Sequence, residues 1–179
     1  MQQLRAVDFS VSHTTRAARN NEQHGRDYHF VSTREFEHMI DAGDFVEYAQ
    51  VFDHWYGTSR QAIETVLQRQ HHVLLDIDWQ GAMKVRKVLP DAISIFIVPP
   101  SLEALRERLV QRGQDSTQAI ERRMSQALSD MAHQNEYDHI LINDDFKTAV
   151  NSLQQVITAA ASGGKSLSPS ENITNNEVY

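Results

Sequence analysis

The stretch LLDIDWQG, residues 74–81, decides how the rest of the chain is interpreted. An apolar strand, predicted over residues 73–77, ends here in Asp76 and Asp78. In open α/β sheets, ligands bind outside the carboxyl ends of the strands, so acids at this point face a crevice. Their spacing of two would put both side chains on the same side of a strand. Such a pair can hold Mg²⁺, directly or through water, or accept hydrogen bonds from a base, unless it only caps the next helix.

Strands and helices alternate over most of the chain. Strands are predicted at residues 9–11, 28–31, 45–52, 73–77, 93–98 and 139–142. Helices are predicted at 60–70, 102–111, 117–131 and 153–161, and a capping box at Ser32 and Glu35 starts another helix that Gly43 ends. Buried strands alternating with helices imply a parallel sheet with right-handed crossovers. The fold class is therefore α/β, with a small β-rich insertion near residues 20–56.

Composition limits the classes of function. With 179 residues, 40% of them hydrophobic, the chain can bury the core of one domain, and the lack of cysteine excludes disulfides and zinc-thiolate sites. The net charge of −7 argues against a nucleic-acid partner, because such binding depends on excess Lys and Arg. No apolar run could span a bilayer, and the first residues lack the apolar core of a secretory signal. We therefore expect a cytoplasmic protein with no membrane association.

Two arginines follow a hydroxyl-rich stretch at residues 10–15. Arg16 and Arg19 lie three residues apart, after the strand predicted at residues 9–11. Planar guanidinium groups match phosphate oxygens in pairs, and hydroxyls add further donors, so the segment suits a monophosphate. Taken alone, it could equally be a solvated loop.

The order of the motifs resembles that of guanylate kinases. The matching segments are residues 12–19, 27–31, 47, 55–58, 76–81, 99–101, 112–113 and 143–145. The resemblance runs from about residue 9 to about 160. It implies a parallel sheet like that of P-loop kinases, flanked by helices, with an insertion at about 20–56 that binds GMP and a helical lid at about 108–123 that closes over ATP. These would form one domain, residues 1–161, followed by a disordered tail at 162–179, where Gly, Ser, Asn and Pro predominate.

The resemblance also implies residue roles. The GMP phosphate would be bound by Arg16, Arg19, Tyr28 and Tyr56, and guanine would be recognised by Ser12, Glu47, Thr58 and Asp78. The arginines that neutralise charge on the transferring phosphoryl group would be Arg108, Arg112 and Arg123. Asn143 would lie near the ATP base, and Asp76 would contact the water shell of Mg²⁺. Taken singly, the tyrosines could be ordinary packing residues, and Arg123 could lie on a solvated helix face.

The beginning of the chain departs from the family pattern. Guanylate kinases start with a strand, a glycine-rich phosphate loop that ends in Gly-Lys-Ser or Gly-Lys-Thr, and a helix. Only eight residues precede Phe9, and residues 1–7 resemble the end of that helix. We expect the first strand and the phosphate loop to be absent, which would impair catalysis because the loop holds the ATP phosphates. Residues 159–166 nearly match the loop pattern, but a helix precedes them, and Gly163 fits a helix C-cap better.

Smaller departures are Ala18 and Asn21, where the family tends to have Pro and Gly.

The predicted function is phosphoryl transfer from ATP, with Mg²⁺, to GMP. The alternative is a non-catalytic module of the same fold that binds a nucleotide or a phosphopeptide.

Overall fold

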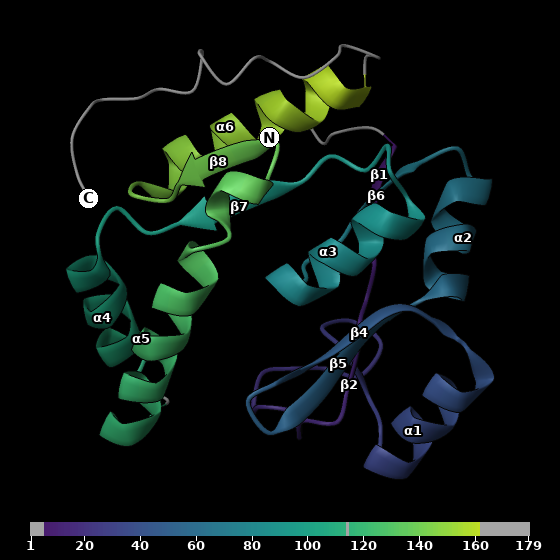
Figure 1. Ribbon diagram of the computed structural model, residues 1–179, viewed down its shortest axis with the longest axis horizontal. Coiled ribbons are helices and arrows are strands. Elements are labelled where there is room, and N and C mark those ends of the chain that lie inside the picture. Colours follow the sequence, from purple (N-terminus) through teal and green to yellow (C-terminus); the bar gives the residue numbers. More distant parts are fainter. Residues whose placement is uncertain (1–5, 114, 162–179) are drawn as a thin grey trace. The chain divides into compact units, whose positions relative to one another are not determined.

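The computed structural model describes residues 6–113 and 115–161 (Figure 1). Contacts divide the chain into two compact units, residues 1–92 (unit 1) and residues 93–179 (unit 2). Both units combine helices with parallel strands, so the α/β prediction is confirmed.

Unit 1 contains two sheets. Its elements are β1 (Val7–Phe9), β2 (His13–Thr14), β3 (His29–Phe30), α1 (Thr33–Ala42), β4 (Phe45–Val51), β5 (His54–Ser59), α2 (Arg60–Gln68), β6 (His72–Leu74) and α3 (Trp79–Val88). Strands β1 and β6 pair in parallel, and the other four form a sheet in the order β3-β2-β5-β4. Strands β4 and β5 form an antiparallel hairpin that packs against α3, which brings the start of α3 to the hairpin.

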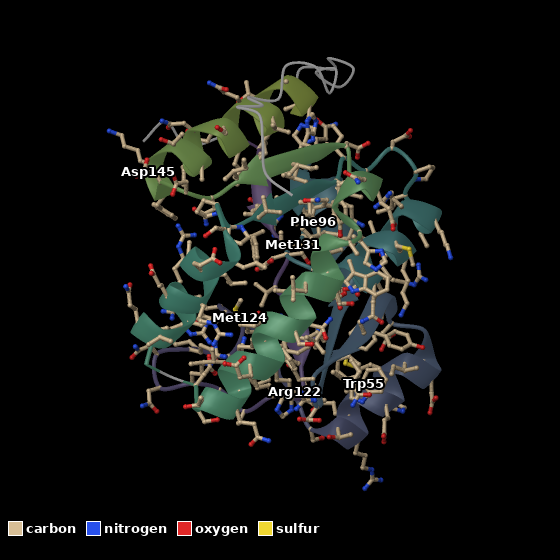
Figure 2. The ribbon with its side chains drawn as sticks, turned by 60° about the vertical axis from the view of Figure 1, so that its left-hand side comes forward. Trp55, Phe96, Arg122, Met124, Met131 and Asp145 are labelled. Carbon is tan, nitrogen blue, oxygen red and sulfur yellow. The ribbon has the colours of Figure 1, made fainter. Side chains whose placement is uncertain are left out.

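Aromatic rings fix α1 against the hairpin. Phe36 of α1 is fully buried and stacks on Phe45, with ring centroids 4.5 Å apart, and on Trp55, which Figure 2 labels. A Cβ at Gly57 would lie 2.9 Å from the Phe45 ring, so only glycine leaves room for this packing. These ring contacts thus hold the hairpin in place against α1.

Unit 2 is built on one parallel strand pair. Its elements are β7 (Ile95–Val98), α4 (Leu102–Gln111), α5 (Thr117–Met131), a 3₁₀ turn (Gln134–Glu136), β8 (His139–Ile142) and α6 (Phe146–Ala161). Strands β7 and β8 pair in parallel, while α4 and α5 lie against each other (Figure 1). Figure 2 shows Met124 and Met131 along α5; Met124 is buried.

Serine caps set most helix starts as predicted. Ser59, Ser101 and Ser116 each accept a hydrogen bond from a backbone N–H in the first turn of α2, α4 and α5. Ser32 accepts from the Glu35 N–H, and α1 ends at Gly43, whose φ of 72° is in the left-handed region. The predicted bounds of α4, α5 and β8 are confirmed.

Other predicted bounds were wrong. Strand β6 ends at Leu74, not at residue 77, and β1 covers Val7–Phe9, so Val7 is in a strand and not at the end of a helix. Strand β5 and helix α3 were not predicted as elements. Residues 159–161 belong to α6, as predicted. The remainder of that loop-like segment, Gly163 and the tail at 162–179 lie outside the described residues, as do residues 1–5, and the absence of a phosphate-loop strand stays a prediction.

Candidate functional site

Asp78 caps a helix, as the simpler interpretation held. It is the N-cap of α3, and its Oδ1 accepts a hydrogen bond of 2.8 Å from the Gly81 N–H. The Gln80 amide lies 3.3 Å from Oδ2. Because β6 ends at Leu74, the prediction that Asp76 and Asp78 share one side of a strand was wrong: both follow the strand, and Asp76 is exposed.

Glu47 and Thr58 lie opposite each other on β4 and β5. Glu47 is 4% exposed and Thr58 is fully buried, and the Thr58 hydroxyl donates a 2.6 Å hydrogen bond to Glu47 Oε1. A Cβ built on Gly81 would lie 2.7 Å from Glu47 Oε2 and 3.3 Å from Asp78 Oδ1. Both carboxylates therefore meet at the Gly81 backbone, and we call Glu47, Thr58 and Asp78 the acid cluster.

Charge in the acid cluster is only partly compensated. Burial raises the pKa of the Glu47 carboxyl, the Thr58 hydrogen bond opposes that rise, and the nearby Asp78 charge adds to it. Lys84 on α3 lowers the same pKa. A buried carboxylate in this state gains from a ligand that donates hydrogen bonds to it.

Arg16 is already paired with a carboxylate. Its Nη1 and Nη2 donate to the two oxygens of Glu22 at 2.9 and 2.8 Å, and Nη1 also donates to the Ala17 carbonyl. The Arg19 backbone N–H donates to Glu22 at 2.8 Å, while the Arg19 guanidinium lies 3.8 Å from it. Glu22 was not predicted, although a carboxylate three residues after Arg19 could have suggested the pair.

Two tyrosines lie beside this ion pair. The Arg16 guanidinium is 5.5 Å from the centre of the Tyr28 ring, and the rings of Tyr28 and Tyr56 are 5.9 Å apart. Burial raises the pKa of Tyr28, and the charge of Asp76 raises it further, so Asp76 faces the same group. We call Arg16, Arg19, Tyr28 and Tyr56 the arginine–tyrosine cluster.

Hydroxyls near Arg16 serve the fold. Thr14 is fully buried, and its hydroxyl donates to the Trp55 carbonyl while accepting from the Arg16 N–H. The Thr15 hydroxyl accepts from the Trp55 N–H at 2.9 Å. These bonds tie the Arg16 segment to β5 and use the Thr14 proton within the fold, whereas the Thr15 hydroxyl only accepts, so its part in phosphate binding stays a prediction. Ser12 is buried, and its carbonyl accepts from the His29 N–H.

Unit 2 brings together the remaining candidates. Arg108 on α4 donates to the backbone carbonyls of Asn143 and Asp144 at 2.7 and 2.8 Å. Arg112 and Arg123 both contact Asp115, at 3.2 and 3.3 Å, and this carboxylate was not predicted. Arg108 and Arg112 thus lie on α4 and at its end, and Arg123 lies on α5. Arg108 also bonds to the segment that follows β8.

The carboxylates suit a metal only through water. Within residues 6–113 and 115–161, no group of three or more His, Cys, Asp or Glu side chains is arranged to hold a metal ion. Asp76 is a single exposed carboxylate, which fits Mg²⁺ that keeps most of its water and its substrate ligands. In the same described segments, no helix is long and apolar enough to cross a bilayer.

Comparisons with known proteins agree on one family. The sequence model of the family described as guanylate kinase matches residues 2–160. The chain is 50% identical to a guanylate kinase of Alkalilimnicola ehrlichii, covering 89% of this chain and 78% of that protein. It is 55% identical to a guanylate kinase of Pseudoalteromonas translucida, covering 86% and 74%. The crystal structure of guanylate kinase from Anaplasma phagocytophilum superposes with a TM-score of 0.75 at 35% identity, over 86% of this chain and 76% of that one.

Proposed function

Because this chain belongs to the guanylate kinase family, we propose that it transfers a phosphoryl group from ATP to GMP, giving ADP and GDP. The acid cluster carries this proposal. The geometry of Glu47, Thr58 and Asp78 suits a base that presents two neighbouring donors. Guanine does so with its N1–H and its exocyclic amine, whereas adenine presents an acceptor at N1.

The raised pKa of Glu47 supports the assignment. A carboxylate buried without full compensation is costly, and proteins keep such groups where a ligand supplies the missing donors. Thr58 holds one oxygen of Glu47, and the Gly81 backbone lies against the other. Glu47 and Asp78 would accept from guanine while Thr58 fixes Glu47 and Ser12 borders the base.

The arginine–tyrosine cluster is the proposed phosphate site. Arg16 and Arg19 supply positive charge, and the hydroxyls of Tyr28 and Tyr56 supply donors, in the pattern that suits a phosphate dianion. The Thr14 and Thr15 bonds to β5 fix the segment that carries both arginines. Phosphate and base would then be held by the same four-stranded sheet.

The arginines of unit 2 are the proposed catalytic residues. Arg108, Arg112 and Arg123 would neutralise charge on the transferring group, because phosphoryl transfer depends on positioning and electrostatic stabilisation more than on covalent chemistry. Arg108 already bonds to the carbonyl of Asn143, the proposed neighbour of the ATP base. Mg²⁺ bound with ATP would neutralise phosphate charge, and Asp76 would hold one of its waters.

Calorimetric titration of the 179-residue chain with GMP and with AMP tests the acceptor assignment. We expect GMP to bind at least about a hundredfold more tightly, because AMP leaves the buried carboxylates facing an acceptor. Equal binding of both nucleotides would contradict base recognition. Release of ADP from ATP in the presence of GMP, followed in a coupled assay, tests the transfer step, and GMP binding without turnover would favour a non-catalytic module.

A further inference from the structure

Glu22 contacts the proposed phosphate site, but the proposed function gives it no role. Its carboxylate is 16% exposed and accepts three hydrogen bonds, from Arg16 Nη1, Arg16 Nη2 and the Arg19 N–H. The Arg19 guanidinium lies 3.8 Å away. One carboxylate thus contacts both arginines of the proposed phosphate site.

The pairing leaves part of the Arg16 guanidinium available. A guanidinium has five N–H donors and two edges, Nη1–Nη2 and Nε–Nη2, that can each grip an oxyanion in two places. Glu22 takes the first edge, and the Ala17 carbonyl takes the other N–H of Nη1. A phosphate that bound at the Nε–Nη2 edge would therefore not displace Glu22, and it would share the guanidinium with Tyr56, whose side-chain hydrogen bond also raises the Arg16 pKa.

Aromatic side chains also surround the Arg16 guanidinium. The Tyr28 and Phe30 rings lie 5.5 and 5.8 Å from the Arg16 guanidinium. Together with Glu22, these rings restrict the positions that the guanidinium can take. The Glu22 hydrogen bond raises the pKa of Arg16, burial opposes the rise, and the Tyr56 hydroxyl adds to it, which places Tyr56 near the guanidinium as well.

We propose that Glu22 is a positioning residue, which orients Arg16 and Arg19 so that both present donors to the phosphate of the acceptor nucleotide. A long side chain held by two bonds loses its rotamer freedom before the ligand arrives, so less entropy is lost on binding. The hydrogen bond from the Arg19 N–H fixes the loop that carries the second arginine. This role rests on the proposed function.

Glu22→Gln is the variant that tests it. The amide keeps the size of the side chain but places an NH₂ donor against Arg16, so one of the two bonds is lost. We expect GMP to bind about tenfold more weakly, with no change for guanosine, which lacks the phosphate. Glu22→Asp should retain more GMP affinity than Glu22→Gln. Glu64→Gln, an exposed residue on α2 with the same charge change, is the matched control and should bind GMP like the parent chain.

The outcomes separate this role from others. Equal losses for GMP and guanosine would mean that Glu22 only maintains the fold, and unchanged GMP binding would mean that it has no role in the site. Tighter GMP binding by Glu22→Gln would mean that Glu22 competes with the phosphate. Each of these overturns the positioning role alone. Failure of the parent chain to bind GMP would overturn the proposed function, and the positioning role with it.

Discussion

The acid cluster and the arginine–tyrosine cluster both include residues of β5, but their charges are compensated to different degrees. Glu47 is buried with a neutral hydroxyl as its hydrogen-bond partner and with another carboxylate nearby. Arg16 is paired on two atoms with Glu22. Without a ligand, the charge of the first cluster is only partly compensated, whereas the second has its counter-charge built in.

The difference suggests separate tasks for the two clusters: the acid cluster discriminates among bases, and the arginine–tyrosine cluster positions the phosphate. An uncompensated buried carboxylate penalises every ligand that lacks matching donors, so it discriminates among bases. A compensated arginine contributes less net attraction but holds a fixed orientation. In the proposed function, base recognition depends on the buried acids, and phosphate binding depends on the prearranged arginines.

Among the variants of the two clusters, Glu47→Gln should reduce GMP affinity the most. The amide still accepts from Thr58 but presents a donor to guanine, so we expect GMP affinity to fall by a hundredfold or more. The same change removes a buried charge whose pKa burial raises, so it should also raise the free energy of unfolding at pH 7. Calorimetry and urea unfolding measure the two effects. A variant that unfolds more easily and keeps its GMP affinity would contradict both expectations.

Arg16→Ala tests the other cluster. It removes a bidentate donor and leaves Glu22 near the site with Arg19 as its remaining partner, so we expect roughly thirtyfold weaker GMP binding. Guanosine binding should not change, since the acid cluster remains. Titrations with both ligands measure the effect, and Arg60→Ala on α2 serves as a control of equal charge change. Retained GMP affinity would remove Arg16 from the phosphate site.

Gly81→Ala probes the close approach of both carboxylates to the Gly81 backbone. The new Cβ would lie 2.7 Å from Glu47 Oε2, so that oxygen or the start of α3 must move, and we expect about tenfold weaker GMP binding. Gly43→Ala is the contrasting control: its Cβ meets no atom within 4 Å, but its φ of 72° should cost about 1 kcal/mol of stability. Unfolding and GMP titration of both variants should therefore give opposite patterns. Unchanged GMP affinity in Gly81→Ala would show that the close approach at Gly81 has no effect on binding.

The last expected effect concerns acid stability and leaves GMP binding aside. Burial, followed by the charge of His29, lowers the pKa of His13 from 6.5 to about 4, and the two rings stack at 4.6 Å. Since the unfolded chain binds this proton more readily, stability should be lost as the pH falls from 6.5 towards 4. His13→Phe should flatten this part of the unfolding curve, whereas His38→Phe, at an exposed position of α1, should not. An unchanged curve for His13→Phe would assign the acid sensitivity to other groups.

Local signals in the sequence predicted much of the fold. Serine caps act on the first turn of a helix, and the alternation of buried strands with helices is a property of short segments, so α4, α5 and β8 were found with their bounds. The end of β6 was missed because Leu75 and Ile77 continue the apolar residues of the strand past Leu74.

The candidate site was predicted less completely for the same reason. The pairing of Glu47 with Thr58 depends on the hairpin register, and the approach of Asp78 depends on how α3 packs against it. Glu22 and Asp115 were missed because a carboxylate in a polar loop looks like ordinary surface until the arginines that it holds are seen. Motif order identified the candidate residues, but the ion pairs between them required the structure.

The double use of Asp78 limits how the nucleotide preference of this chain can be redesigned. The same carboxylate begins α3 and faces the proposed base position, so a replacement must still accept from the Gly81 N–H. Asn, Ser and Thr retain that ability, while aliphatic residues would lose the cap, at a cost of about 1 kcal/mol. A library aimed at a different purine should therefore be restricted at residue 78 to cap-forming side chains, with the larger diversity placed at residues 47 and 58.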